Sequence, residues 1–119
     1  ADFLNLVAAF DTVTPLEALH LQLRDIEAAC GRDRSFEQTP PCIDIDLLLF
    51  GDTVRETDPE LPRVDILKHA FVLGPLAELL PETRHPVCGR RYDALWAQMA
   101  ARSTPLEPVV LRRDAPLTP

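Results

Sequence analysis

Lysine is almost absent from this sequence, since Lys68 is the only one. The 12 basic residues are outnumbered by 19 acidic ones, which gives a formal net charge of -7. Proteins that bind nucleic acid meet its phosphates with clustered lysine and arginine. The charge balance therefore argues against nucleic acid as the main partner.

Cysteine and long apolar runs are also scarce. Cys30, Cys42 and Cys88 are odd in number and lack a C-x-x-C spacing, which favours free thiols over a disulfide framework. His85 and Cys88 offer only two metal ligands, which is too few for a closed zinc shell. No apolar run approaches the roughly 20 residues of a membrane span, and the opening residues show no secretory signal. We therefore expect a cytoplasmic protein that does not enter membranes.

The chain of 119 residues suffices for one domain with a small core. We expect that domain to cover residues 1–103. Residues 104–119 are rich in proline, and Pro108 argues against a helix there. We therefore predict an extended tail, with an edge strand near residues 109–111 as one alternative.

Two carboxylates lie two residues apart in the apolar run 43–50. Successive side chains of a strand point to opposite faces and rise about 3.3 Å each, so Asp44 and Asp46 share one face roughly 7 Å apart. Mg²⁺ prefers oxygen ligands and is often held by one or two carboxylates plus substrate phosphates. The pair therefore predicts a magnesium site for a nucleotide. The alternative is an edge strand with solvated acids, because this spacing alone carries little information.

The best-determined helix covers residues 14–31. Thr14, Pro15 and Glu17 form a helix start, and apolar residues then recur at spacings of three and four until Gly31. The other predicted elements are strands at 3–12, 43–50 and 53–55, the last two joined as a hairpin through Gly51-Asp52, and helices at 70–80, interrupted near Pro75, and 92–101.

The context of the acid pair resembles a known family. The residues that carry the resemblance are 40–51 (PPCIDIDLLLFG), 69–81 (HAFVLGPLAELLP), 2–5 (DFLN), 14–19 (TPLEAL) and 26–32. In the same order, they are similar to the 6-hydroxymethyl-7,8-dihydropterin pyrophosphokinases of folate biosynthesis. The resemblance covers roughly residues 1 to 100.

The resemblance implies an α+β fold, the ferredoxin-like sandwich with the order β-α-β-β-α-β. This sequence matches mainly the second β-α-β half plus C-terminal helices. Its central strand is then expected to have a bare edge. Three arrangements would cover that edge: a longer product of which this chain is a fragment, the tail near residues 109–111, or a homodimer in which two copies complete the sheet.

The resemblance also implies an activity. Family members transfer a pyrophosphoryl group from ATP to the pterin hydroxymethyl group, with Mg²⁺ held by acids that match Asp44 and Asp46. Arg32 and Arg34 match the loop that contacts the transferring phosphates. Both pairs are therefore our candidate catalytic residues.

The pterin site is implied by three further matches. Phe3 and Asn5 match the loop that holds the pterin ring, and Phe71 matches an aromatic residue that stacks on it. We therefore expect a small-molecule pterin and ATP as the partners.

Several positions depart from the family pattern. Pro41 and His69 stand where an arginine is expected, and Arg63 stands where a histidine is expected. Proline cannot replace an arginine fork on a phosphate, and histidine replaces it weakly near neutral pH. Two alternatives to a full enzyme therefore stay open: a non-catalytic pterin- or nucleotide-binding module or partner subunit, and a relative with only a structural role.

Overall fold

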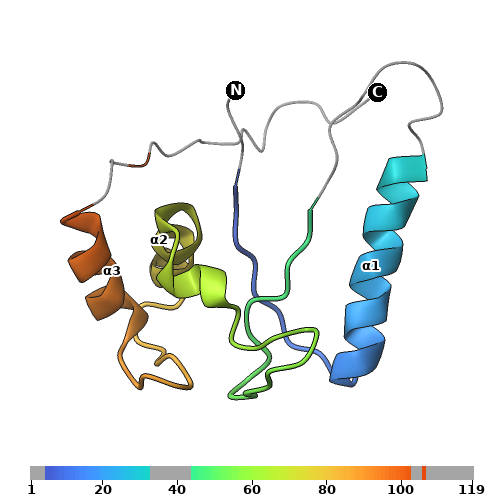
Figure 1. Ribbon diagram of the computed structural model, residues 1–119, viewed down its shortest axis with the longest axis horizontal. Coiled ribbons are helices and arrows are strands. Elements are labelled where there is room, and N and C mark those ends of the chain that lie inside the picture. Colours follow the sequence, from blue (N-terminus) through green and yellow to red (C-terminus); the bar gives the residue numbers. More distant parts are fainter. Residues whose placement is uncertain (1–4, 33–43, 103–105, 107–119) are drawn as a thin grey trace.

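A computed structural model describes residues 5–32, 44–102 and 106 of the chain, without the side chains of residues 31 and 32. The predictions for Phe3, Arg34, Pro41 and Cys42 lie outside these residues, as does the rest of the tail. The described part contains three α-helices and one 3-10 helix (Figure 1).

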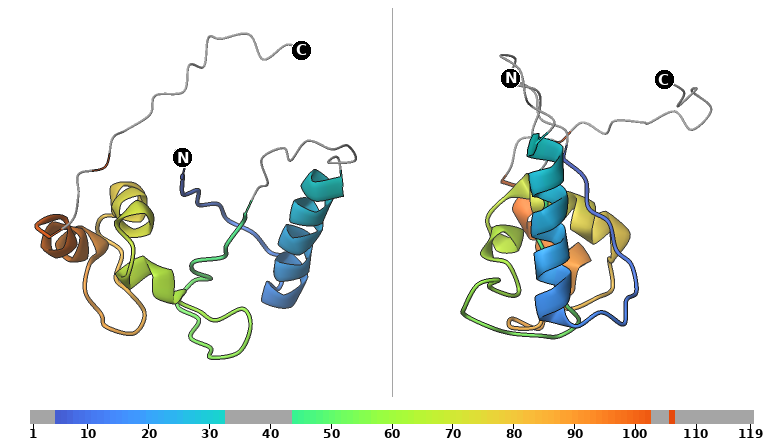
Figure 2. Two further views of the ribbon diagram at one scale, coloured as in Figure 1. Left: turned by 45° about the horizontal axis from the view of Figure 1, so that its top comes forward. Right: turned by 90° about the vertical axis from the view of Figure 1, so that its right-hand side faces the viewer.

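The helix predicted after Thr14-Pro15 is confirmed as α1, Leu16–Arg32. The amide of Leu19 donates to the carbonyl of Pro15 at 2.9 Å, which starts the helical ladder. Leu19 is buried, whereas Leu21 and the C-terminal half of α1 are largely exposed. Helix α1 lies on the opposite side of the extended segments 5–13 and 44–50 from the remaining helices (Figures 1 and 2).

The main core joins η1 (Val64–Leu67), α2 (Ala70–Leu79) and α3 (Tyr92–Ala100). Its buried members are Ile66, Leu73, Leu76, Ala77 and Tyr92. Trp96 and Met99 pack against this cluster, as their helical spacing predicts. Gly74 lets α3 come close, because a Cβ there would lie 3.1 Å from the Trp96 ring.

Helix α2 runs through Pro75, so the predicted interruption at that residue is wrong. Proline removes one amide donor from the helical ladder. Leu73 and Leu76, on either side of it, are both buried in the core. Apolar burial on both sides offsets the lost hydrogen bond, since a buried leucine contributes about 1.5 to 3 kcal/mol.

The predicted strands do not form ladders in the described residues. Segments 5–12 and 44–50 are extended without strand pairing, and the bridges found are isolated ones, Arg55 with Leu61 and Arg84 with Arg91. The turn at Gly51 is confirmed, with Gly51 at a φ of 57°. Arg55, however, exchanges both backbone hydrogen bonds with Leu61 and not with the acid-bearing segment.

The physical reason is that alternation in a sequence specifies the faces of a strand but not its neighbour. A ladder needs a second strand about 4.8 Å away. In the expected ferredoxin-like sheet, the strands of one β-α-β half pair with those of the other half. Within the described residues, no other segment pairs in a ladder with segments 5–12 and 44–50, so neither is assigned as a strand.

His85 organises the turn between α2 and α3. Its side chain is buried, and its Nδ1 accepts hydrogen bonds from the amides of Val87 and Cys88, each at 3.2 Å. Its ring also meets that of Tyr92 edge-on, with the centroids 6.3 Å apart. Within the described residues no three potential metal ligands cluster. The geometry therefore gives His85 a structural role.

We expect His85 to make folding sensitive to acid. Burial lowers the pKa of His85, because the charged imidazolium loses its hydration. The folded state then binds the proton more weakly than the unfolded state. The contribution of His85 to the free energy of unfolding is therefore fully present above the ordinary histidine pKa of about 6.5, and it is lost as pH decreases through the lower folded pKa. Urea unfolding at several pH values measures this.

The matched variant is His85→Asn, which keeps a side-chain acceptor for the turn but does not titrate in this range. It should be less stable than the wild type at neutral pH and should lose part of the decline between pH 6.5 and pH 5. An unchanged decline in the variant would contradict the assignment.

None of the helices in the described residues is both long enough and apolar enough to cross a bilayer.

Candidate active site

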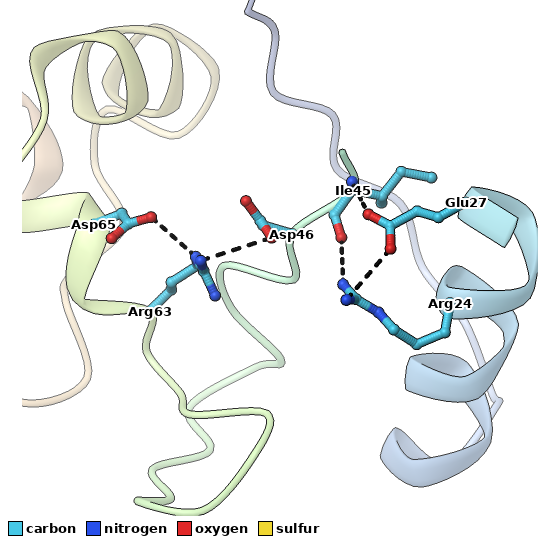
Figure 3. Close-up of polar contacts among 6 residues, drawn as sticks. All are labelled: Arg24, Glu27, Ile45, Asp46, Arg63 and Asp65. Atoms are coloured by element: carbon cyan, nitrogen blue, oxygen red, sulfur yellow. Dashed lines mark hydrogen bonds and ion pairs between the residues drawn. The ribbon is translucent and has the colours of Figure 1, made fainter. Parts of the chain in front are cut away.

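The acid pair lies on the segment 44–50, which α1 holds in place. The amide of Ile45 donates to the carboxylate of Glu27, and its carbonyl accepts from the guanidinium of Arg24 at 2.9 Å (Figure 3). Arg24 and Glu27 also form an ion pair at 3.3 Å. The backbone between Asp44 and Asp46 is thereby fixed to the helix, while both acids are exposed.

Arg63 lies between two carboxylates. Its NH2 group lies 3.7 Å from an oxygen of Asp46, and its Nε donates to Asp65 at 3.1 Å (Figure 3). The amide of Arg63 donates to the carbonyl of Leu48 at 2.9 Å, which ties this loop to the acid-bearing segment. All three charged side chains are partly exposed, so each ion pair contributes at most about 1 kcal/mol. The guanidinium can therefore change partners at little cost.

An aromatic pair follows directly along the chain. The rings of His69 and Phe71 are stacked, with centroids 4.9 Å apart and planes 6° from parallel. The amide of His69 donates to the carbonyl of Asp65 at 3.0 Å. This hydrogen bond ties the backbone of the stacked pair to that of the Arg63–Asp65 ion pair. Phe71 remains partly exposed at the start of α2. One short stretch thus presents a cation, an acid and a flat aromatic surface.

The described part of the structure shows no contact between the remaining candidate residues and the Asp46–Arg63 pair. Asn5 is exposed on the segment that precedes α1. Arg32 ends α1, but its side chain is not described, and Phe3 and Arg34 lie outside the described residues. The roles expected of these four residues therefore stay predictions.

Sequence reasoning missed how Arg63 and Asp65 act together. It noted Arg63 as a departure from the family pattern that could, with His69, replace the usual phosphate donors, and it gave Asp65 no role. The available signal was the charged pair at spacing two after Pro62, which resembles Arg91 and Asp93 at the start of α3. Neither pattern reveals that Asp46, from another segment, approaches the same guanidinium.

The donor chemistry suits a magnesium ion shared with phosphates. Asp44 and Asp46 provide exposed carboxylates, the oxygen ligands that Mg²⁺ takes. The described residues bring no third histidine, cysteine or carboxylate ligand into a cluster. A hard cation here would complete its shell with water and phosphate oxygens, as is usual where Mg²⁺ works with a nucleotide.

Comparison with known proteins places the chain in a family. The model of the family 7,8-dihydro-6-hydroxymethylpterin-pyrophosphokinase (HPPK) matches residues 1–81. The chain is 41% identical over 86 residues to a protein of Pseudomonas aeruginosa named 2-amino-4-hydroxy-6-hydroxymethyldihydropteridine pyrophosphokinase, a match that covers 71% of this chain and 52% of that protein.

Proteins with the same name from two other bacteria are also similar. The Methylorubrum extorquens protein is 44% identical over 82 residues, which cover 67% of this chain and 51% of that protein. The Aquifex aeolicus protein is 34% identical over 87 residues, which cover 72% of this chain and 54% of that protein. The chain thus spans about half the length of these relatives. On the strength of the family match and these identities, the chain belongs to the 7,8-dihydro-6-hydroxymethylpterin-pyrophosphokinase family.

Proposed function

We propose that this chain transfers a pyrophosphoryl group from ATP to 6-hydroxymethyl-7,8-dihydropterin with the help of Mg²⁺. In this reaction the pterin hydroxyl oxygen forms a bond to the β-phosphorus of ATP and loses its proton to solvent. The bond from that phosphorus to the α-phosphate bridge oxygen breaks, and AMP leaves with the bridge oxygen. The observation that carries the proposal is the exposed acid pair Asp44 and Asp46. Helix α1 binds the backbone of Ile45 between them, and Asp46 lies beside Arg63. Family membership supports the choice of reaction and implies a ferredoxin-like α/β fold.

The roles of the residues follow from their charge and position. Asp44 and Asp46 would hold Mg²⁺, which supplies charge neutralisation of the ATP phosphates when bound. Arg32 and Arg34 would contact the same phosphates. Catalysis of phosphoryl transfer consists mostly of positioning and electrostatic stabilisation, so these residues need no covalent role.

The pterin would lie against aromatic and amide groups. Phe71 offers a partly exposed ring, already stacked on His69. Offset stacking of aromatic rings contributes about 0.5 to 1.5 kcal/mol beyond the buried area. Phe3 and Asn5 are proposed to complete the pterin site. We further propose a cytoplasmic location, with no nucleic-acid partner, from the free thiols and the acidic composition.

Arg63 is proposed as a phosphate ligand in place of the arginines replaced by Pro41 and His69. Its Nε is committed to Asp65 at 3.1 Å, whereas its NH2 group is only loosely paired with Asp46 at 3.7 Å. The terminal nitrogens can therefore donate to a phosphate while Asp65 keeps the side chain in place. Arginine suits this task because its planar fork binds phosphate oxygens bidentately.

We predict that Arg63→Ala lowers kcat about 100-fold, the lower end of the range for removing one donor to a developing anion. Arg63→Lys should recover part of the rate, because it keeps the charge but not the fork. The matched control is Arg90→Ala, which removes a surface arginine paired with Gln98 near α3. Steady-state AMP formation measures all three variants. Equal rates for Arg63→Ala and the control would exclude the proposed role.

The experiment that tests the function is AMP release by the purified chain with ATP, Mg²⁺ and 6-hydroxymethyl-7,8-dihydropterin. Pterin-dependent AMP is the expected result. The altered arginine positions favour one second candidate, a pterin- or nucleotide-binding module without turnover. Calorimetric binding of pterin or ATP without AMP release would select the module, whereas neither binding nor release would reject both functions.

A further inference from the structure

The ring of His69 lies flat on the ring of Phe71. The ring centroids are 4.9 Å apart and the planes are 6° from parallel, which is the geometry of an offset stack. Residues two apart do not face each other on a helix, so helical periodicity does not produce this contact. The two rings meet because His69, the residue before α2, has an extended backbone with a φ of -121° and a ψ of 125°.

The side chain of His69 has no part in starting the helix. A residue at this position often caps the first turn with a side-chain oxygen, but His69 makes no side-chain cap hydrogen bond. Its backbone carbonyl instead accepts from the amides of Val72 and Leu73, each at 3.0 Å. The imidazole is exposed and is not needed for α2, so its position on Phe71 calls for another explanation.

The backbone beneath the stack is held at both ends. The amide of His69 donates to the carbonyl of Asp65 at 3.0 Å, and Leu73, which donates to the carbonyl of His69, is buried in the main core. The imidazole therefore rests on a fixed turn and holds the ring of Phe71 in one orientation. A ring that is already oriented loses less side-chain freedom when a ligand stacks on it.

A ring stacked on one face still has a second face. His69 covers one face of Phe71, yet 40% of Phe71 is exposed. A flat heterocycle that took the same face would first have to displace the imidazole and lose an existing stack. The face opposite His69 is therefore the one at which such a ligand gains a contact without losing another.

We propose that His69 is a positioning residue of the pterin site, which backs Phe71 on one face so that the pterin stacks on the other. The inference rests on the pterin binding of the proposed function and adds the residue that fixes the Phe71 ring. In this arrangement the imidazole contacts neither the pterin nor the phosphates. Its role depends on a flat ring and not on charge, unlike that of the arginine expected at this position.

The first test is calorimetric binding of 6-hydroxymethyl-7,8-dihydropterin in the presence of Mg²⁺ and α,β-methylene ATP, which prevents turnover. His69→Asn should raise Kd about three- to tenfold, the value of one aromatic stack. Asparagine is a favoured cap residue, so this variant keeps the start of α2. His69→Phe should keep the wild-type Kd, because it keeps the ring and removes both nitrogens. The control is His20→Asn on α1, which should leave Kd unchanged.

Steady-state kinetics separate the two possible roles of residue 69. His69→Asn should raise KM for the pterin by the same three- to tenfold and leave kcat and KM for ATP nearly unchanged. A residue that donates to the phosphates would instead change kcat or KM for ATP. His69→Phe would then be at least as defective as His69→Asn.

The second test observes the stack itself by proton NMR. An aromatic ring moves the resonances of protons above its face upfield. The ring protons of His69 should therefore lie upfield in the wild-type chain and move downfield in Phe71→Leu. They should stay upfield when the pterin saturates the chain, because the ligand takes the opposite face. The chain has only three histidines, so their absence from the spectrum of His69→Asn identifies these signals.

Three results would overturn the inference: a wild-type Kd in His69→Asn, a Kd in His69→Phe as high as in His69→Asn, or loss of the upfield shift when pterin binds. A chain that binds no pterin would overturn both the inference and the proposed function. Pterin binding with the expected His69 pattern but without AMP release would remove only the pyrophosphoryl transfer. AMP release with an unchanged pterin KM in His69→Asn would remove only the inference.

Discussion

Asp46→Asn should lower pterin-dependent AMP formation at least about 1,000-fold. The substitution keeps the shape of the side chain but removes the charge that would bind Mg²⁺ beside the phosphates. It removes one of two adjacent carboxylates, and the described residues offer no third one in a cluster to replace it. Loss of a single electrostatic contact to a transition state commonly costs 100- to 1,000-fold, and a metal ligand serves several such contacts at once.

The loss should appear first in binding. Calorimetry with ATP should show a Mg²⁺-dependent component for the wild-type chain that disappears with a chelator. The same component should be absent from Asp46→Asn. Folding should be nearly unaffected, since the ion pair that Asp46 makes with Arg63 is long, partly exposed and worth at most about 1 kcal/mol. Thermal unfolding of the variant checks this directly.

The matched control is Asp52→Asn, which neutralises an exposed acid in the turn that follows the same segment. It changes the net charge equally but lies outside the proposed metal site. If both variants bind ATP and Mg²⁺ as the wild type does, the acid pair is a solvated surface feature and the metal role of Asp46 is wrong. If both lose binding equally, net charge and not ligation is responsible.

The elements that sequence reasoning predicted correctly are those held by local contacts. Helix α1 follows from the Thr14-Pro15 start and from apolar residues at helical spacing. Helix α3 follows from the same spacing, with Trp96 and Met99 on the face that packs on the core. Hydrogen bonds in a helix join residues four apart, so the sequence within one window contains most of the information.

Strand pairing and side-chain clustering depend on distant residues. The alternating pattern at 44–50 predicts a charged face, and Asp44 and Asp46 are indeed exposed. The backbone of Ile45, however, forms hydrogen bonds with the side chains of Arg24 and Glu27 and not with another strand. Similarly, the approach of Arg63 to Asp46 joins two segments that the sequence separates by 16 residues. Periodicity carries no information about such contacts, so the site could be predicted only in part.

The largest stability effects should come from Tyr92, at the centre of the main core. Its side chain is completely buried among Ile66, Leu73 and Leu76, at the first turn of α3. Tyr92→Ala should reduce the free energy of unfolding by about 3 to 5 kcal/mol, the usual cost of deleting a buried aromatic ring. Domains are usually stable by only about 5 to 15 kcal/mol, so a loss of that magnitude is a large fraction of the total.

Removing only the hydroxyl group of Tyr92 should increase stability, in contrast to removing the whole ring. It is buried without a hydrogen-bond partner in the part of the chain that the structure describes. A buried polar group left unpaired costs about 1 to 3 kcal/mol, so Tyr92→Phe should raise the free energy of unfolding by roughly 1 kcal/mol while it keeps the ring packed. Urea unfolding of the two variants measures both effects. A stability loss in Tyr92→Phe would mean that the hydroxyl is hydrogen-bonded in solution.

The same hydroxyl should make the fold sensitive to alkali. Burial raises the pKa of Tyr92 to about 12, with smaller contributions from Cys88 and Asp52. The ordinary tyrosine pKa is about 10, so the unfolded state loses its proton first. The contribution of Tyr92 to stability is therefore complete below pH 10 and falls by roughly 1.4 kcal/mol per pH unit as pH rises toward 12. Because Tyr92 is the only tyrosine, the ultraviolet absorbance of phenolate follows it alone. Tyr92→Phe should remove this part of the alkaline decline, and a midpoint near pH 10 in the folded wild type would show that the ring is not buried.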